Sequence, residues 1–373
     1  MLAKILVFDK GGRKERIELI KRKEAPKDFL QGIDFLQSKG FDIKHLSSVK
    51  PYKKNFLFKC GKFLEQFFSM ISNIGIRPLS VFQFKKEIDS CDYVVSLTDG
   101  FSLSLGFYYS FIDKNNKIKL AGSFHKLSDY NLKLPIFLRY FYFKIFLRIL
   151  KRLDYIIFYG ESDRNNAINH FKIEKGKTYI LKFGVDTDFW LPSKKDTFKS
   201  NYLFSIGQDP SRDFDTLLKV KTNKRIHIHT NLLQALETKL IKITNGSYQN
   251  FENSFSDNAI RKLYQDSFTV IIPLKNVFQP SGYSVTLQAM SCGKPIILTL
   301  TKGLWAPKIF QNFENCILVP PNNPIEIENS INFLEQNEEK YRDISQKAIK
   351  TAKKYFSLEN SNSSIYEIFK TFN

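Results

Sequence analysis

Two series of short apolar runs, separated by one polar interval, limit what this chain can fold into. Each run spans five to seven residues, and longer stretches with helical periodicity lie between the runs. Such runs are typical of parallel strands in a sheet that helices cover on both faces. The first series comprises residues 3–9, 92–98, 117–123, 154–160 and 178–183, and the second comprises residues 201–207, 225–230, 269–274, 294–300 and 316–320.

Two such series predict an α/β chain with two doubly wound, Rossmann-like domains that face a cleft. The length of 373 residues also exceeds that of a typical single domain. The polar interval at 182–200 marks the boundary. We therefore expect a first domain over residues 1–184, a second over 185–355, and a final helix at 356–373 that returns to the first domain.

The net charge of +20 is distributed unevenly along the chain. An AT-rich genome would favour lysine throughout, yet residues 1–185 carry a net charge of +16 and the remainder only +4. This asymmetry indicates that the first domain faces an anionic surface. Nucleic acid is not the expected partner, because no nucleic-acid-binding module is recognisable in the sequence.

Cysteine usage and hydropathy indicate a reduced, cytoplasmic protein. The four cysteines are far apart and form no C-x-x-C pair, so neither a disulfide framework nor a zinc site is expected. The apolar run after Lys4 is too short for a signal peptide, and no apolar segment is long enough to span a membrane. The five histidines have no metal-ligand spacing, so no metal site is predicted.

The stretch FQPSGYSVTLQAMSCGKP at 278–295 carries the clearest chemical signal. Ser281 is a good N-cap for the helix that follows, and Gly282 lets a ligand approach the backbone. The N–H groups at the helix start form an anion site suited to phosphate, and Gln288 would reach the same ligand. An ordinary buried helix remains an alternative on these local features. The N–H groups in question belong to Gly282, Tyr283 and Ser284.

Four motifs together resemble those of family-4 retaining glycosyltransferases of the GT-B fold. SGYSVTLQAMSCGKPIILT is similar to the donor-binding signature, and YILKFGVDTDFW at 179–190 is similar to the interdomain segment. The others are LFSIGQDPSRDFDTLL at 203–218 and ENCILVPPNNPIEIENSI at 314–331. The resemblance is collinear from about residue 154 to the end, whereas the first 120 residues match only in pattern.

The resemblance implies a nucleotide-sugar donor, expected to be UDP-linked, with no metal and no other cofactor. It places Arg212 at the donor diphosphate and Gln288 at the ribose hydroxyls. His125, in LAGSFHKLSDY at 120–130, would lie beside the transferred sugar, although a structural loop histidine is the alternative. His125 and Arg212 are therefore the predicted catalytic residues. The predicted donor-binding residues are Gly11, Gly12, Gln208, Arg212, Ser281, Gly282, Tyr283, Ser284 and Gln288.

Three positions depart from the family pattern. Pro280 stands where the first of two glutamates is usual, Gln288 stands at the second, and Gln208 replaces an arginine. A glutamine still hydrogen-bonds hydroxyls without charge assistance, whereas a proline cannot replace a carboxylate. These departures leave the identity of the sugar open. For Gly11 and Gly12, a plain loop is nearly as good an interpretation as a donor or acceptor contact.

The acceptor side is expected in the basic, aromatic segments at 131–155 and 52–76. Such amphipathic segments lie in membrane interfaces and are attracted to anionic lipid, although a core helix with cations at its edge has the same pattern. The charge of the first half favours membrane contact. The predicted contacts are Lys133, Arg139, Lys144, Arg148, Lys151 and Arg152.

Together these features predict a hexosyltransferase that acts with retention of configuration at the inner face of the cell membrane. A membrane lipid such as diacylglycerol is the preferred acceptor. A saccharide acceptor in surface polysaccharide or lipopolysaccharide assembly is the first alternative. A non-catalytic sugar-nucleotide-binding protein is the second, because the usual glutamate is absent.

Overall fold

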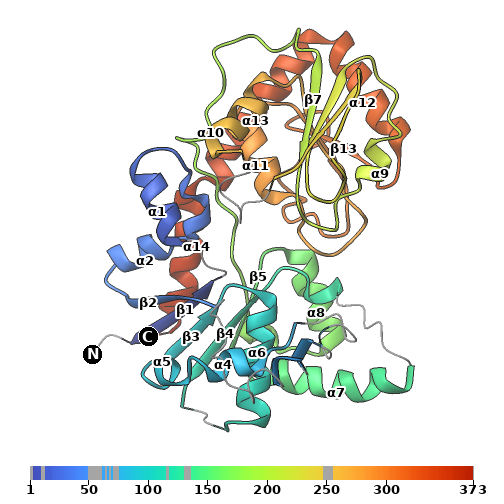
Figure 1. Cartoon of the computed structure of the whole chain (residues 1–373). Helices are drawn as coiled ribbons and strands as arrows, with labels where there is room; N and C mark the ends of the chain where they lie inside the picture. Colours follow the sequence, from blue (N-terminus) through green and yellow to red (C-terminus); the bar gives the residue numbers. More distant parts are fainter. Residues whose placement is uncertain are drawn as a thin grey trace. The chain divides into compact units, whose positions relative to one another are not determined.

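The computed structural model describes residues 3–9, 13–48, 61–63, 65–66, 69, 75–114, 117–129, 136–246 and 255–372. The chain forms two compact units, each built around its own sheet (Figure 1). The first unit comprises residues 1–12, 32–181 and 364–373, and the second comprises residues 13–31 and 182–363.

The first unit has a six-stranded parallel sheet in the order β2-β1-β3-β4-β5-β6. The central strands are buried, as expected for a sheet with helices on its faces. Its strands are β1 (Lys4–Asp9), β2 (Asp42–Ser47), β3 (Tyr93–Ser96), β4 (Lys119–Phe124), β5 (Tyr155–Phe158) and β6 (Thr178–Ile180). Its helices are α2 (Ile33–Ser38), α4 (Pro78–Phe82), α5 (Lys85–Asp89), α6 (Asp99–Phe111), α7 (Ile136–Arg152) and α8 (Glu161–Phe171), with 3-10 turns at Leu127–Asp129 and Lys175–Lys177.

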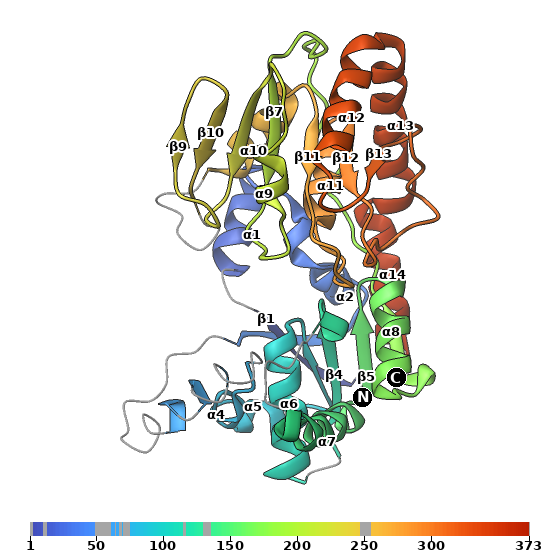
Figure 2. The ribbon, with the colours of Figure 1, turned by 90° about the vertical axis from the view of Figure 1, so that its right-hand side faces the viewer.

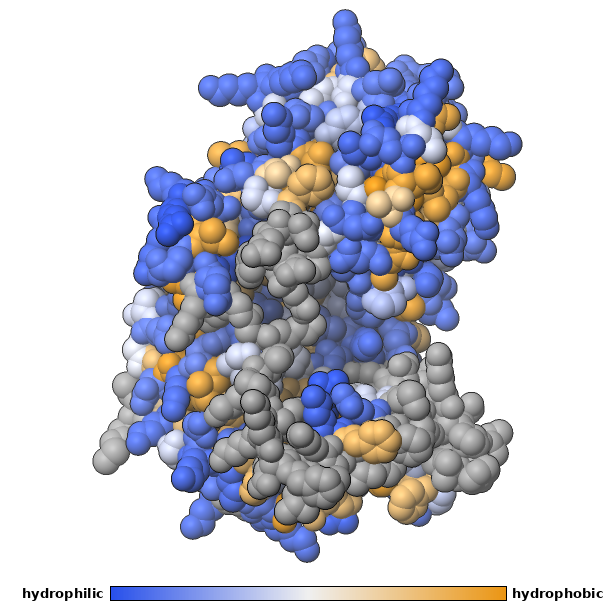
Figure 3. Space-filling model, in the orientation of Figure 1, coloured by the Kyte–Doolittle hydropathy of each residue, from blue (hydrophilic) through white to orange (hydrophobic). Residues whose placement is uncertain are grey.

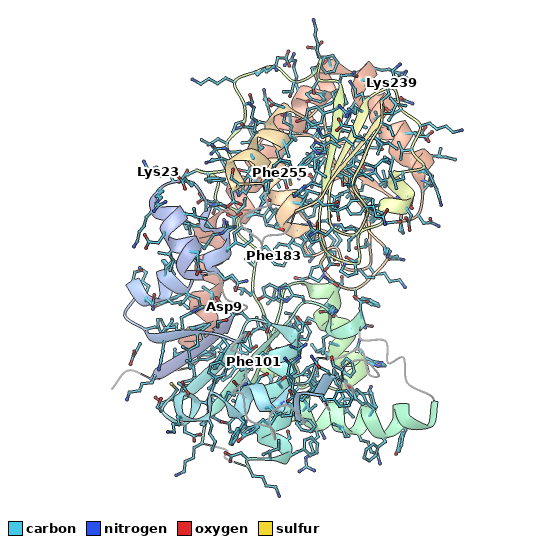
Figure 4. All side chains as sticks on the ribbon, in the orientation of Figure 1. Asp9, Lys23, Phe101, Phe183, Lys239 and Phe255 are labelled. Atoms are coloured by element: carbon cyan, nitrogen blue, oxygen red, sulfur yellow. The ribbon has the colours of Figure 1, made fainter. Side chains whose placement is uncertain are left out.

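Aromatic side chains fill the core of the first unit. Phe8 of β1 packs against Phe84 and Phe101, with ring centroids 5.0 and 4.5 Å away, and all three are buried. Figure 4 labels Phe101 within this core. Aromatic pairs at these distances contribute beyond the apolar area that they bury, so the packing holds α6 firmly against the sheet.

The second unit has a seven-stranded sheet in the order β13-β12-β11-β7-β8-β10-β9, in which only β9 is antiparallel to its neighbour (Figure 2). Its strands are β7 (Tyr202–Ile206), β8 (Arg225–His229), β9 (Leu236–Glu237), β10 (Ile241–Thr244), β11 (Val270–Ile272), β12 (Ile296–Thr299) and β13 (Ile317–Val319). Its helices are α1 (Arg13–Lys21), α9 (Phe214–Leu217), α10 (Asp257–Asp266), α11 (Tyr283–Ser291), α12 (Pro324–Gln336) and α13 (Glu338–Phe356), with a 3-10 turn at Lys27–Leu30.

Each of the ten predicted runs contains a strand, and the predicted class of two doubly wound α/β domains is confirmed. The sequence did not indicate β2, β9 or β10. All three lie at or near a sheet edge, where polar residues alternate with apolar ones. A strand buried on one face only has no continuous apolar run, so the pattern that identified the other strands is missing here.

Two segments pack with the unit formed mainly by the other half of the sequence. Residues 13–31, directly after β1, pack with the second unit. Helix α14 (Leu358–Lys370) begins in the second unit and ends in the first, which contains residues 364–373. Phe372 stacks on Tyr93 with ring centroids 4.8 Å apart, and Tyr155 donates its hydroxyl to the carbonyl of Thr371 at 3.2 Å. These contacts fix the chain end to the sheet of the first unit.

Hydrophilic residues predominate on the face of the second unit that Figure 3 shows. Within the part of the chain that the structure describes, no helix combines the length and apolar character needed to cross a membrane.

Candidate functional site

The N-terminus of helix α11 leaves its backbone open to close approach by a ligand. Gly282 occupies the N-cap position with φ of +78°, a left-handed conformation that glycine adopts without strain. The prediction that Ser281 is the N-cap is therefore wrong. Its hydroxyl instead contacts the hydroxyl of Ser211. The N–H groups of the first turn have no partner within the helix, and the helix dipole favours an anion beside them.

Arg212 lies tightly against Gly282 and Gly207. A Cβ atom added to Gly207 would come 2.1 Å from Arg212 Nε, and one added to Gly282 would come 3.3 Å from Arg212 Nη1 and 2.7 Å from Ile272 Cγ2. A side chain at residue 207 would force the guanidinium to move, and one at residue 282 would clash with Ile272, so Gly207 leaves the space that the guanidinium occupies. The backbone of Arg212 is fixed by a bridge to Leu274 beyond β11. The cation is thus held at the start of α11.

The Arg212 guanidinium is buried without a full set of partners. The residue is 6% exposed, and both Nε and Nη1 are enclosed with no hydrogen-bond acceptor among the described residues. Burial lowers its pKa to about 10, although the nearby charge of Asp209 opposes this shift. A buried cation with unused donors is costly. The arrangement is suited to an anionic ligand that supplies the missing acceptors.

Asp209 is engaged by neighbouring side chains. Its Oδ1 accepts a hydrogen bond from the Ser211 amide at 2.8 Å, and its Oδ2 accepts one from Gln279 Nε2 at 2.7 Å. Burial favours the neutral acid, yet the bonds from Ser211 and Gln279 and the charge of Arg212 hold its pKa below the ordinary value. Asp209 therefore stays ionised and orients the loop that carries Arg212.

Gln288 lies in α11 inside a network of polar side chains. It is 2% exposed, and its Oε1 accepts from the Tyr264 hydroxyl while its Nε2 donates to Asp28 Oδ2, both at 3.2 Å. The same Asp28 carboxylate accepts from Trp190 Nε1 at 2.8 Å and from the Asp186 amide at 2.5 Å. Burial, partly offset by these bonds, raises the pKa of Asp28 to about 6.

Gln208, Tyr283 and Ser284 are further residues of the second unit that the sequence predicts to bind the nucleotide sugar. Gln208 holds two loops together, because it donates to the Gly246 carbonyl at 2.9 Å and accepts from the Asn231 amide at 2.6 Å. Tyr283 stacks on Phe183, which Figure 4 labels, with interplanar angle 11°. Burial raises the pKa of the Tyr283 phenol to about 12. Ser284 is half-buried in the first turn of α11.

In the first unit, His125 follows β4 and is oriented by Asp99, the first residue of α6. Asp99 accepts from the His125 amide at 3.0 Å, and its Oδ1 lies 3.1 Å from His125 Nδ1. The imidazole stacks on Tyr159 with centroids 4.1 Å apart. Burial alone would raise the pKa of Asp99, but its bonds to His125 lower it. The ionised carboxylate therefore fixes the ring and leaves Nε2 as its other polar atom.

The predicted membrane cations differ in how they are held. Lys144, Arg148 and Lys151 are exposed on α7, with Lys144 over the Tyr140 ring at 4.6 Å. Arg152 instead forms an ion pair with Asp154 at 3.2 Å. Four predicted site positions have no described side chain: Gly11, Gly12 and Lys133 lie outside the described residues, and the side chain of Arg139 is outside them as well.

Sequence patterns did not single out Asp28 or Asp99. Neither forms part of a recognisable motif, and each meets its partner only through the fold, Asp28 across 260 residues and Asp99 across 26. An aspartate at the first position of a helix after a buried strand was the one available signal for Asp99.

The geometry agrees with comparisons to known proteins. Residues 231–351 match the family model of glycosyl transferases group 1. No curated protein matches the chain in sequence. The whole chain is similar in structure to HepE of Anabaena in complex with UDP-glucose, with a TM-score of 0.65, 16% identity, and coverage of 99% of this chain and 100% of the other.

Two further structures show the same fold. Sucrose-phosphate synthase of Thermosynechococcus elongatus has a TM-score of 0.69 at 12% identity and covers 99% of this chain, with 98% of its own chain matched. The lipopolysaccharide outer core galactosyltransferase WaaB has a TM-score of 0.58 at 13% identity, with coverage of 98% and 99%. The chain therefore has the GT-B fold, as predicted. The match of residues 231–351 to glycosyl transferases group 1 agrees with the predicted enzyme class.

Proposed function

We propose that this glycosyltransferase transfers a hexosyl unit from a UDP-sugar to its acceptor with retention of configuration. The observation that carries the proposal is the buried guanidinium of Arg212, whose Nε and Nη1 have no acceptor among the described residues, beside the glycine that begins α11. A diphosphate supplies acceptors for both groups and for the N–H groups of the helix start. HepE, a protein of similar structure, has been crystallised with UDP-glucose.

In this mechanism, the leaving diphosphate is the main site of developing charge. Arg212 and the first turn of α11 stabilise that charge as the glycosidic bond breaks, so the proposal requires no metal ion. We assign His125 to the transferred sugar: with Nδ1 held by Asp99, the other ring nitrogen is available to a sugar hydroxyl. The donor-binding role of Gln208 and Ser281 is proposed on the family resemblance alone.

For the acceptor, we propose a membrane lipid such as diacylglycerol, reached from the cytoplasmic face by a peripherally bound enzyme. The support is the outer side of α7, where Tyr140 and Phe141 are 68% and 66% exposed beside Lys144, Arg148 and Lys151. Exposed aromatic rings insert at the headgroup level of a bilayer, and neighbouring cations attract anionic lipid.

A saccharide acceptor is the second candidate, favoured by the likeness to the lipopolysaccharide galactosyltransferase WaaB. The deciding experiment incubates the enzyme with radiolabelled UDP-glucose, UDP-galactose or UDP-N-acetylglucosamine and either diacylglycerol vesicles or a saccharide pool. A labelled lipid supports the lipid acceptor, and a labelled saccharide alone supports the second candidate. Proton NMR of the product reports retention at the anomeric carbon.

The proposal also predicts the effect of removing the cation. Arg212→Ala should lower turnover at least a hundredfold, because an arginine that stabilises a leaving phosphate supplies several kilocalories per mole at the transition state. Absence of transfer by the wild-type enzyme with any nucleotide sugar and either acceptor class would instead favour a non-catalytic sugar-nucleotide-binding protein.

A further inference from the structure

The segment that follows the first strand carries an acidic residue into the second unit. Residues 13–31, which include α1, pack in that unit. They are anchored by an ion pair in which Arg16 Nη1 lies 2.5 Å from Asp257 Oδ2, with side chains only 13% and 4% exposed. A second anchor is the Lys27 amide, which donates to Asp186 Oδ2 at 3.0 Å. The position of Asp28 is therefore set by the contacts of two residues that precede it in the segment.

The three hydrogen bonds to the Asp28 carboxylate leave it oriented but not saturated. Its donors are the Asp186 amide, Trp190 Nε1 and Gln288 Nε2. A carboxylate offers about four acceptor positions, so one has no donor among the residues that the structure describes. Trp190 is fully buried and Gln288 nearly so, whereas Asp28 is half-buried. Of these three residues, Asp28 therefore has the largest exposed fraction.

The sequence predicts that Gln288 binds the ribose, but hydrogen bonds within the second unit already occupy its side-chain amide. Tyr264 occupies its oxygen and Asp28 its nitrogen, so both ends of the amide are already used within the unit. A glutamate at 288 would stand 3.2 Å from the Asp28 carboxylate and repel it. An amide at this position is thus the group that accommodates the neighbouring acid.

Asp28 also lies close enough to the start of α11 to influence it. Burial of the phenol and, to a smaller extent, the charge of Asp28 raise the pKa of Tyr283, which directly follows Gly282. The start of α11 also borders the Arg212 guanidinium. A nucleotide with its diphosphate at Arg212 and Gly282 has its ribose adjacent, and a ribose hydroxyl is a donor that matches one free carboxylate position.

We propose that Asp28 is the acidic donor-binding residue of this chain, accepting a hydrogen bond from a ribose hydroxyl of the nucleotide while Gln288 and Trp190 hold its carboxylate in place. This inference rests on the proposed function, and it assigns ribose recognition to a residue outside the α11 motif. The lost glutamate at 288 is thereby replaced by an aspartate that is remote in sequence but adjacent in the fold.

Deoxy analogues of UDP test the assignment directly. Calorimetric titration at pH 7.5 compares UDP, 2′-deoxy-UDP and 3′-deoxy-UDP on the wild type, Asp28→Asn and the control Asp188→Asn, whose carboxylate is exposed in the same unit. The wild type and the control should bind UDP about tenfold to a hundredfold more tightly than one analogue, as expected for a hydrogen bond to a charged group. Asp28→Asn should bind UDP and both analogues within about twofold of one another.

A conservative variant guards against a trivial loss of structure. Asp28→Glu keeps a carboxylate at residue 28 and should retain at least half of the wild-type discrimination on a logarithmic scale. Tryptophan fluorescence checks that each variant is folded. If Asp28→Asn retains full discrimination, the inference is overturned and the proposed function stands. If the wild type does not bind UDP, both are overturned.

Discussion

Replacing Arg212 by methionine should make the protein more stable and abolish donor binding. The guanidinium is 6% exposed and has two nitrogens without acceptors. Burial lowers its pKa from the ordinary value of arginine to about 10, which corresponds to about 3 kcal/mol of lost stabilisation of the charged form. The folded state binds fewer protons than the unfolded state only at a pH between the folded and the unfolded pKa, so at pH 7 the full penalty applies.

Methionine fills a similar volume without a charge, so Arg212→Met should gain about 1–3 kcal/mol in free energy of unfolding. For a unit of this size, that gain raises the Tm by about 2–10 °C. Saturating UDP at a hundred times its Kd should stabilise the wild type by about 2.7 kcal/mol and the variant hardly at all. The difference in Tm between Arg212→Met and the wild type should therefore become smaller, or change sign, when UDP is added.

Tryptophan fluorescence is the suitable assay, because both tryptophans, Trp190 and Trp305, lie in the second unit. The matched control is Arg261→Met, since Arg261 donates to the Phe189 carbonyl at 2.9 Å and lies 4.6 Å over the Phe189 ring. The control should melt at lower temperature and keep its response to UDP. A lower Tm for Arg212→Met with an unchanged response to UDP would refute the reasoning.

Three further predictions follow from the site and the surface. Gly282→Ala should lower the free energy of unfolding by about 1–3 kcal/mol and weaken UDP binding, because a Cβ at φ of +78° meets Ile272, and thermal melting with UDP checks both. Burial raises the pKa of Asp163 to about 7, so wild-type stability should fall as the pH rises from about 4 to 7, and Asp163→Asn should reduce that slope to the part due to Asp28 in urea titrations at several pH values. Replacing Lys144, Arg148 and Lys151 by serine should reduce sedimentation with anionic vesicles at low salt about tenfold or more, whereas wild-type binding that does not weaken with added salt would contradict the membrane proposal.

The sequence predicted the two sheets well because their central strands are buried on both faces and read as continuous apolar runs. It also predicted that Arg212 and the start of α11 would serve one ligand, and the structure brings Arg212 Nη1 against Gly282. The cap was wrong because a serine is the usual choice there, and the left-handed φ of Gly282 is not visible in a pattern. Local signals describe residues near in sequence and say little about backbone dihedrals.

The network around Asp28 could not be predicted for a different physical reason. Its hydrogen bonds join Asp28 to Trp190 across 162 residues and to Gln288 across 260. Helix and strand periodicity carry no information on such pairs, and the docking of residues 13–31 on the second unit is a property of tertiary packing. For this reason, the sequence alone left the absence of an acid at position 288 unexplained, whereas the fold supplies a neighbouring carboxylate.

The packing around Arg212 is easier to understand as a binding arrangement than as a means of stabilising the fold. Two glycines leave room for a guanidinium that gains no full set of hydrogen bonds in return, and an apolar side chain in the same space would be stabilising. Groups positioned before the ligand arrives need no reorganisation when charge develops on it, which is the condition for electrostatic catalysis. Gly207 and Gly282 therefore act together with Arg212: a Cβ at Gly207 would displace the guanidinium, and a Cβ at Gly282 would clash with Ile272 beside it.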